Sequence, residues 1–272
     1  MNKKFSLAYL TLPDTQPVDQ IEIASLCGYD GVGLRNLSGN WPADKKYALA
    51  DEALFTQVKD ALARTGVELM DIELGRVLDG VDVASYEEEF AKGAELGAKY
   101  VTASIWTQDT GYAKEQLTKM SDLAAKYGLT LSMEFVPFAA MATLADVLEW
   151  IRKANCPNIK ILVDLLHAYR THVTPAQLAT IDPDLFGCIH LCDGPAFIPP
   201  LDHPDMKGVT REARLYMGEG GMDILPILQA IPNPPYYAIE LPNLKAMDTL
   251  GKLGHARKSL ETTKAYFQKY KL

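Results

Sequence analysis

The chain of 272 residues contains 48% hydrophobic and 23% charged residues, which is enough apolar material for a folded core and excludes a disordered polypeptide. Lys and Arg number 27 against 35 Asp and Glu, giving a formal net charge of −8, and this acidic balance argues against a nucleic-acid-binding protein. No apolar run approaches the roughly 20 residues that span a bilayer, so we expect no membrane association.

Short β-rich segments alternate with amphipathic helical segments along the chain, at intervals of about 30 residues. The segments with strand character are Phe5–Leu12, Gly31–Leu34, Val67–Leu74, Tyr100–Ile105, Leu129–Val136, Ile159–Leu165, Gly187–Cys192 and Tyr237–Leu241. The helical segments that follow them are Val18–Cys27, Tyr47–Thr65, Tyr86–Leu96, Lys114–Tyr127, Leu144–Lys153, Pro175–Ala179, Ile224–Ala230 and Gly254–Lys269. This alternation predicts βα units around a parallel sheet.

Eight strand–helix pairs in about 250 residues are typical of a (β/α)8, or TIM, barrel. We therefore predict an α/β fold with one such domain over residues 1–272, since no composition shift or Ser/Gly-rich linker divides the chain. Several predicted helices end at a glycine, as at Gly28 and Gly66, where a left-handed backbone closes the helix. An open doubly wound sheet is the alternative, but Leu12-Pro13-Asp14-Thr15 stands where that fold has a glycine-rich phosphate turn.

The connection from Gly194 to Met222 is the outlier among the predicted loops. It contains several prolines, Arg211, Arg214 and the run Gly218-Glu219-Gly220-Gly221. Loops of this length in compact domains are usually functional or disordered. Because the loops after the strands of a barrel build its catalytic face, we expect this connection to cover the mouth of the barrel.

Four consecutive predicted strands end in residues that can bind a metal, namely Glu134, Asp164, His190 and Glu240. The C-terminal ends of barrel strands meet at one mouth, and an ionised carboxylate in apolar surroundings is costly unless it is paired or binds a metal. Three carboxylates and one imidazole suit a single divalent ion such as Mn²⁺, Mg²⁺, Co²⁺ or Zn²⁺. The alternative is that each acid caps a helix or forms an ion pair.

Five short motifs lie in the second half of the chain: Met133-Glu134-Phe135, Asp164-x-x-His167, His190-x-x-Asp193, Arg214-x-x-x-Gly218-Glu219-Gly220 and Ile239-Glu240. Together they resemble the xylose-isomerase-like barrel superfamily, which includes sugar phosphate isomerases and epimerases, inosose and 3-dehydroshikimate dehydratases, and abasic-site endonucleases. The resemblance implies that Glu134, Asp164, His190 and Glu240 hold one divalent metal and that the two glutamates are the acid/base pair. It also implies that His167 and Arg214 contact the substrate.

The activity that this resemblance implies is that of a metal-dependent isomerase or epimerase, which transfers a proton next to the carbonyl of a small polyhydroxylated sugar or sugar-like keto compound. A divalent cation would stabilise the enediolate while Glu134 and Glu240 exchange the proton. The alternative enzyme is a metal-dependent dehydratase of a cyclic keto acid or inosose, in which the same carbanion loses water. A catalytically silent barrel that binds a metabolite or a partner protein is the alternative outside enzymes.

The positions of the histidines argue against the endonuclease branch, whose three-zinc cluster needs histidines on the early strands. The five histidines are His167, His172, His190, His203 and His255, and none precedes the sixth predicted strand. This pattern fits one metal and not three. We expect the side chains of His172, His203 and His255 to be solvated.

Other residues at strand ends are weaker candidates for the site. We predict that Glu73 and Trp106 contact the substrate, although Glu73 could instead cap the next loop and Trp106 could plug the barrel. Arg211 and Arg214 could bind a carboxylate or phosphate with bidentate hydrogen bonds. Asp193 lies on the opposite side of the pleat from His190, so we expect it to brace a loop.

The expected setting of the protein is the cytoplasm. The four cysteines are too few and too scattered for disulfides to stabilise a chain of this length, and the N-terminal segment lacks the apolar run of a signal peptide. The expected partner is a small-molecule substrate, with no nucleic acid and no membrane. Relatives often pair through the mouth region, so the resemblance implies a homodimer or homotetramer.

Overall fold

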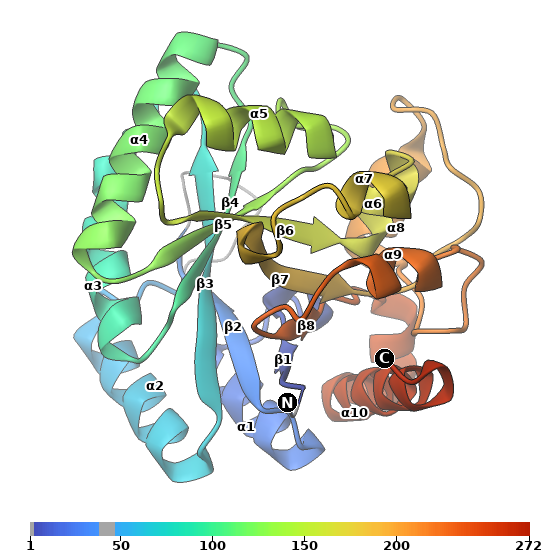
Figure 1. The fold of residues 1–272 in the computed structure, drawn as a ribbon. Helices are drawn as coiled ribbons and strands as arrows, with labels where there is room; N and C mark the ends of the chain where they lie inside the picture. The colour runs from blue at the N-terminus through green and yellow to red at the C-terminus, as the bar shows by residue number, and fades with distance from the viewer. Residues whose placement is uncertain (1–2, 38–46) are drawn as a thin grey trace.

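Eight parallel strands close into a barrel in the computed structural model, which describes residues 3–37 and 47–272 (Figure 1). Each strand pairs with the next along the chain, and the last pairs with the first. The strands are β1 Phe5–Leu7, β2 Gly31–Arg35, β3 Glu68–Val77, β4 Tyr100–Ile105, β5 Thr130–Glu134, β6 Ile159–Asp164, β7 Phe186–Leu191 and β8 Tyr237–Ile239. This topology confirms the predicted (β/α)8 barrel.

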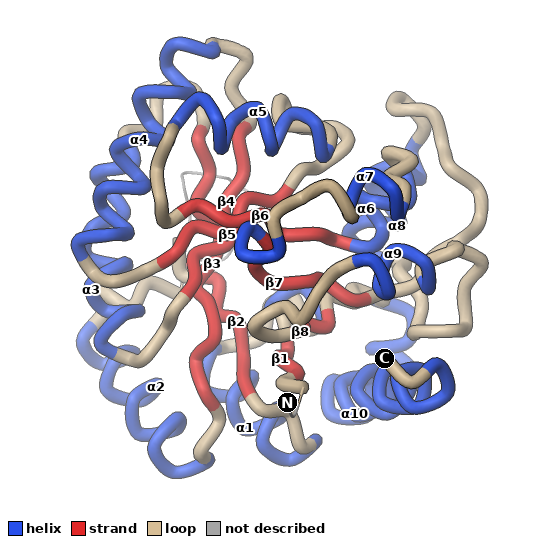
Figure 2. The backbone as a smooth tube through the Cα atoms, viewed as in Figure 1, coloured by secondary structure: helices blue, strands red, loops and turns tan. Residues whose placement is uncertain are grey.

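Helices surround the barrel and bury its outer surface (Figure 2). They are α1 Pro17–Cys27, α2 Glu52–Thr65, α3 Glu87–Glu95, α4 Thr110–Lys126, α5 Leu144–Ala154, α6 Leu165–Arg170, α7 Pro175–Leu178, α8 Pro204–Glu212, α9 Leu225–Ala230 and α10 Leu244–Tyr270. Short 3-10 turns lie at η1 Tyr9–Thr11, η2 Val83–Tyr86 and η3 Pro183–Leu185. Within the described residues, no helix has both the length and the apolar character needed to cross a membrane.

Two elements near the N-terminus differ from the predicted boundaries. The first strand ends at Leu7 because the chain turns into η1, where the Thr11 hydroxyl donates to the Ile239 carbonyl at 2.7 Å. The second helix begins at Glu52 because the Asp51 carboxylate caps it, accepting from the N–H groups of Ala53 and Leu54. In both places a hydrogen bond made by a side chain sets the boundary, which apolar periodicity does not reveal.

Two helical segments in the C-terminal half were also misjudged from the sequence. The long connection after β7 contains the helix α8, where the sequence predicts a loop. The last helix begins at Leu244, well before the predicted start at Gly254, and a non-helical residue, Gly251 with φ 69°, interrupts it. The glycine gives the segment a left-handed backbone at this point, so the pattern of apolar residues breaks there.

Asp193 braces the long connection, as the sequence analysis predicted. Its carboxylate accepts hydrogen bonds from the backbone N–H groups of Gly194, Gly218, Gly220 and Met222, at 2.7, 3.1, 3.1 and 3.3 Å. One buried side chain thus holds both ends of the segment against the end of β7.

Replacing Gly220 with alanine is expected to destabilise the protein by about 2 kcal/mol, because close-packed positions tolerate added methyl groups poorly. A Cβ atom on Gly220 would lie 2.2 Å from Asp193 Oδ1 and 2.5 Å from the Gly194 carbonyl oxygen. The control is Gly208→Ala in α8, where an added Cβ meets nothing within 4 Å. Chemical denaturation checks both variants, and equal stabilities for the two would contradict the packing argument.

Candidate metal centre and active-site pocket

Four side chains converge at the C-terminal mouth of the barrel, as the sequence predicted. Glu134 and Asp164 end β5 and β6, His190 lies in β7, and Glu240 follows β8. The strand register places Asp164 opposite His190 and places His190 opposite Ala238. Alternation along parallel strands therefore aims these residues at one point inside the mouth.

The distances within this group, which we call the ligand cluster (Glu134, Asp164, His190 and Glu240), are short. His190 Nδ1 lies 3.4 Å from Glu134 Oε1, 3.3 Å from Glu240 Oε2 and 3.9 Å from Asp164 Oδ2. All four potential ligand atoms lie within 4.8 Å of one another. A metal held at about 2.0–2.2 Å from each ligand atom requires separations of this order.

The chemistry of the ligand cluster fits a divalent cation. Glu134 Oε1 and His190 Nδ1 are buried, and neither atom has a hydrogen-bond partner among the described residues. Burial opposes protonation of His190, but the charges around it, above all Glu240, raise the pKa of His190 well above its usual range. Buried polar atoms are normally satisfied, so an unpartnered oxygen and nitrogen that face each other indicate a missing positive partner.

Arg214 binds directly to two members of the ligand cluster. Its Nη1 donates to Asp164 Oδ2 at 2.6 Å, and its Nη2 lies 2.8 Å from Glu240 Oε2. The Arg214 side chain is fully buried, and Nε donates to the Thr210 carbonyl at 3.0 Å, which fixes the plane of the guanidinium. The resemblance implied a substrate contact for Arg214, which stays a prediction; the structure shows that this arginine holds two of the predicted ligands.

The two glutamates of the ligand cluster differ in their affinity for a proton. Burial raises the pKa of Glu134 to about 7, and the nearby Glu240 adds to the rise. Burial also opposes ionisation of Glu240, but His190 and Arg214 outweigh it and hold the pKa of Glu240 well below its usual range. Such a split between two carboxylates is typical of acid/base pairs.

His167 lies beside the ligand cluster on α6. Its backbone N–H donates to Asp164 Oδ1 at 3.0 Å, so Asp164 is the N-cap of α6 while its other oxygen binds Arg214. The His167 ring lines the pocket, and its Nδ1 has no partner among the described residues. Burial lowers the pKa of His167 to about 4, so the ring is neutral and can exchange hydrogen bonds with substrate oxygens.

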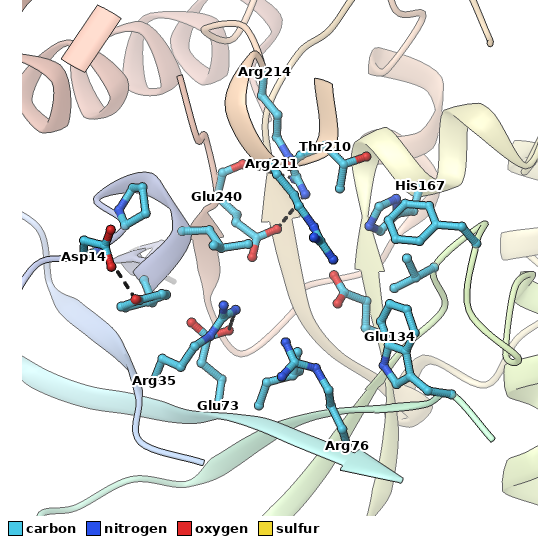
Figure 3. A pocket seen from close by; sticks show the side chains of 17 residues that line it. Asp14, Arg35, Glu73, Arg76, Glu134, His167, Thr210, Arg211, Arg214 and Glu240 are labelled. Atoms are coloured by element: carbon cyan, nitrogen blue, oxygen red, sulfur yellow. Dashed lines mark hydrogen bonds and ion pairs between the residues drawn. The ribbon is translucent and has the colours of Figure 1, made fainter. Parts of the chain in front are cut away.

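A pocket opens above the ligand cluster (Figure 3). Glu134 and Glu240 point into it from different sides. The predicted residues Glu73, Trp106, His167 and Arg214 also line it, and so do Thr210 and Arg211 from α8. The long connection after β7 therefore covers part of the mouth, as predicted.

Several lining residues were missed or left unassigned by the sequence analysis. Tyr9, Arg76 and Phe138 line the pocket, and Arg35 does so with its Nη2 3.2 Å from Glu73 Oε2. Arg76 was missed because β3 continues through an irregularity between Glu73 and Gly75, whereas the predicted strand ended at Leu74. The irregularity shifts the alternation by one residue, so a strict period-2 pattern continued from Glu73 selects Gly75 and Val77 and not Arg76.

Comparisons with known proteins agree with this architecture. The family model for xylose isomerase-like TIM barrels matches residues 21–266. The solved structure of an IOLI protein with a bound zinc atom superposes with a TM-score of 0.80 at 20% identity, over 98% of this chain and 99% of that one.

Two curated relatives are enzymes. An inosose isomerase of Bacillus velezensis is 23% identical over 290 residues, covering 96% of this chain and 95% of the relative. A 3-dehydroshikimate dehydratase of Pseudomonas putida is 23% identical over 239 residues, covering 83% of this chain but 35% of the longer relative. These similarities are consistent with an enzyme and leave more than one reaction open.

Proposed function

The chain belongs to the xylose isomerase-like TIM barrel family, and we propose that it is a divalent-metal-dependent isomerase or epimerase. The proposed reaction transfers a proton next to the carbonyl of a small polyhydroxylated keto compound. The observation that carries the proposal is the convergence of Glu134, Asp164, His190 and Glu240 below an open pocket. The inosose isomerase relative supports the same class of reaction.

The ligand cluster is the proposed holder of the metal ion. Its three carboxylates and one imidazole suit Mn²⁺, Mg²⁺, Co²⁺ or Zn²⁺, and the zinc atom in the related IOLI structure supports a divalent ion. When bound, such an ion supplies a positive charge that stabilises negative charge on substrate oxygens.

The protein's own groups would then transfer the proton. Glu134 and Glu240 reach the pocket from different strands, so one can remove a proton from one face of the substrate and the other can return a proton to the opposite face. Return to the same carbon gives epimerisation, and return to the neighbouring carbon gives isomerisation. Trp106 and Phe138, whose ring centroids lie 6.0 Å apart, form an apolar wall that packs against substrate C–H groups and limits water.

A dehydratase of a cyclic keto acid is the second candidate function. The specific observation in its favour is that four arginines line the pocket, three of them in addition to Arg214. Guanidinium groups recognise carboxylates with paired hydrogen bonds. The 3-dehydroshikimate dehydratase relative supports this candidate.

Solvent deuterium uptake tests the proposed function. Protein loaded with Mn²⁺, Co²⁺ or Zn²⁺ is incubated in D₂O with ketoses, inososes and cyclic keto acids, and the products are followed by NMR. Deuterium next to the carbonyl without loss of water supports the isomerase or epimerase. An unsaturated product supports the dehydratase, and the absence of exchange with every compound supports a binding protein without this activity.

Replacing Arg214 with methionine is expected to destabilise the metal-free protein by about 3–5 kcal/mol, because buried carboxylates lose their positive partner. Added Mn²⁺ or Zn²⁺ should restore more stability to this variant than it adds to the wild type, since the ion replaces the missing charge. Thermal unfolding with and without metal measures both effects. The control is Arg35→Met, which removes a buried ion pair with Glu73 outside the ligand cluster. An equal metal response in all three proteins would contradict the prediction.

A further inference from the structure

Three arginines besides Arg214 form a basic lining of the pocket. Arg35 ends β2, Arg76 lies in β3, and Arg211 lies in α8 of the long connection. Figure 3 shows their side chains extending into the pocket from separate elements. We call Arg35, Arg76 and Arg211 the arginine wall.

The two arginines on the barrel strands are buried, and Arg35 is anchored by its neighbours. Arg35 and Arg76 are only 6% and 5% exposed, although both line the cavity. Arg35 lies over the Tyr9 ring, 4.6 Å from its centroid, and its Nη2 lies 3.2 Å from Glu73 Oε2. Because a buried guanidinium is costly to desolvate, its place on a cavity wall indicates a role in recognising negative charge.

Arg211 differs from the other two because it is exposed and comes from α8. Among the described residues, no carboxylate lies within salt-bridge distance of Arg211. Lys207, one turn earlier on α8, adds a second positive charge at the mouth, where its Nζ lies 5.8 Å from the Phe138 ring centroid. The helix therefore presents cations toward the opening through which a substrate enters.

The arginines of the pocket divide into two groups that act on different parts of the site. Arg214 is already bound to Asp164 and Glu240, so its charge balances the ligand cluster. The arginine wall lines the rest of the pocket, and the charge of Arg35 also helps to lower the pKa of Glu240. A substrate whose carbonyl end lies at the ligand cluster would place its other end against this wall.

We propose that the substrate carries an anionic group, a carboxylate or a phosphate monoester, at the end remote from its reacting carbonyl, and that the arginine wall binds this group. The inference rests on the proposed function for the position of the carbonyl end. It adds a charge requirement that neither an isomerase nor an epimerase activity implies. Arg211 is the specificity-determining member, because its side chain comes from α8 in the long connection and not from a strand of the barrel.

Two matched pairs of compounds test this proposal on the metal-loaded protein. L-Sorbose and 5-keto-D-gluconate differ by a carboxylate, and D-fructose and D-fructose 6-phosphate differ by a phosphate, so the pairs distinguish the two anionic groups. Binding is measured by calorimetry at constant ionic strength. Charged hydrogen bonds of this kind are expected to make the anionic member of at least one pair bind about 10- to 100-fold more tightly.

Arg211→Gln should remove about 10-fold of that preference. The control Arg152→Gln removes an equal charge from exposed α5, away from the pocket, and should leave the preference unchanged. Equal binding of neutral and anionic members in both pairs, failure of all four compounds to bind, or an Arg211→Gln variant with the wild-type preference would each overturn the proposal. Binding is measured independently of turnover, so absent deuterium uptake would count against the proposed function and not against the anion preference.

Discussion

Replacing Glu134 with glutamine is expected to slow deuterium uptake next to the substrate carbonyl by about 10²- to 10⁴-fold, the usual contribution of a positioned acid or base. Glutamine keeps the size of the side chain and an oxygen at the same position, but it cannot accept a proton. Glu134 is suited to the role because it is buried at the mouth, belongs to the ligand cluster and points into the pocket. The rate of uptake by NMR measures the effect, and metal content measured in parallel shows whether the ion is retained.

The control for this variant is Glu73→Gln. Glu73 is a buried carboxylate of the same pocket, but it is bound to Arg35 and lies outside the ligand cluster. Its replacement should act chiefly on KM, whereas Glu134→Gln should act on kcat. A Glu134→Gln variant that retains its metal and exchanges deuterium at the wild-type rate would remove Glu134 from the proton transfer.

Stripping the metal with a chelator is expected to reduce deuterium uptake to the background rate. The Glu134, Asp164 and Glu240 carboxylates would then face one another without the ion, with Arg214 and the His190 imidazole as their neighbouring positive groups. A ligand present at 1,000 times its Kd stabilises the folded state by about 4 kcal/mol, so thermal unfolding should also shift to lower temperature on stripping. Adding back Mn²⁺, Co²⁺ or Zn²⁺ should restore both properties.

The matched control is the same chelator treatment followed by removal of the chelator without added metal. Full activity in protein whose metal content is far below one ion per chain would refute the role of the ligand cluster. A loss of activity with no change in the unfolding temperature would indicate that the ion binds together with the substrate and not to the free protein.

The ligand cluster could be predicted from the sequence because its geometry follows from local rules. Glu134, Asp164 and His190 lie on adjacent parallel strands, and the register between neighbouring strands brings strand ends to a common level. Strand alternation then decides which side chains face the inside of the barrel. Apolar neighbours in each strand made an isolated acid unfavourable, and this pointed to a shared positive partner.

The partners of the arginines could not be predicted in the same way. The contacts of Arg214 with Asp164 and Glu240 depend on where α8 and the following turn are placed, and no local pattern specifies that placement. His255 is a second example, since it was expected in solvent but is fully buried. Its Nδ1 lies 2.7 Å from the Tyr216 hydroxyl, and its Nε2 lies 3.0 Å from the Leu241 carbonyl oxygen. These contacts join residues that are distant in the sequence.

The brace at Asp193 ties together the two ends of the covering segment, residues 194–222. Because one carboxylate binds the backbone at Gly194 and again at Gly218, Gly220 and Met222, the two ends of the segment meet at a single fixed base. Arg214 lies between those ends and binds Asp164 and Glu240, so changes in length or composition elsewhere in the segment can leave the ligand cluster in place only if this arginine is kept. Exchange of this insert between homologous enzymes, with the counterpart of Arg214 retained, is therefore a route to new substrate preferences on the same reaction centre, both in evolution and by grafting in the laboratory.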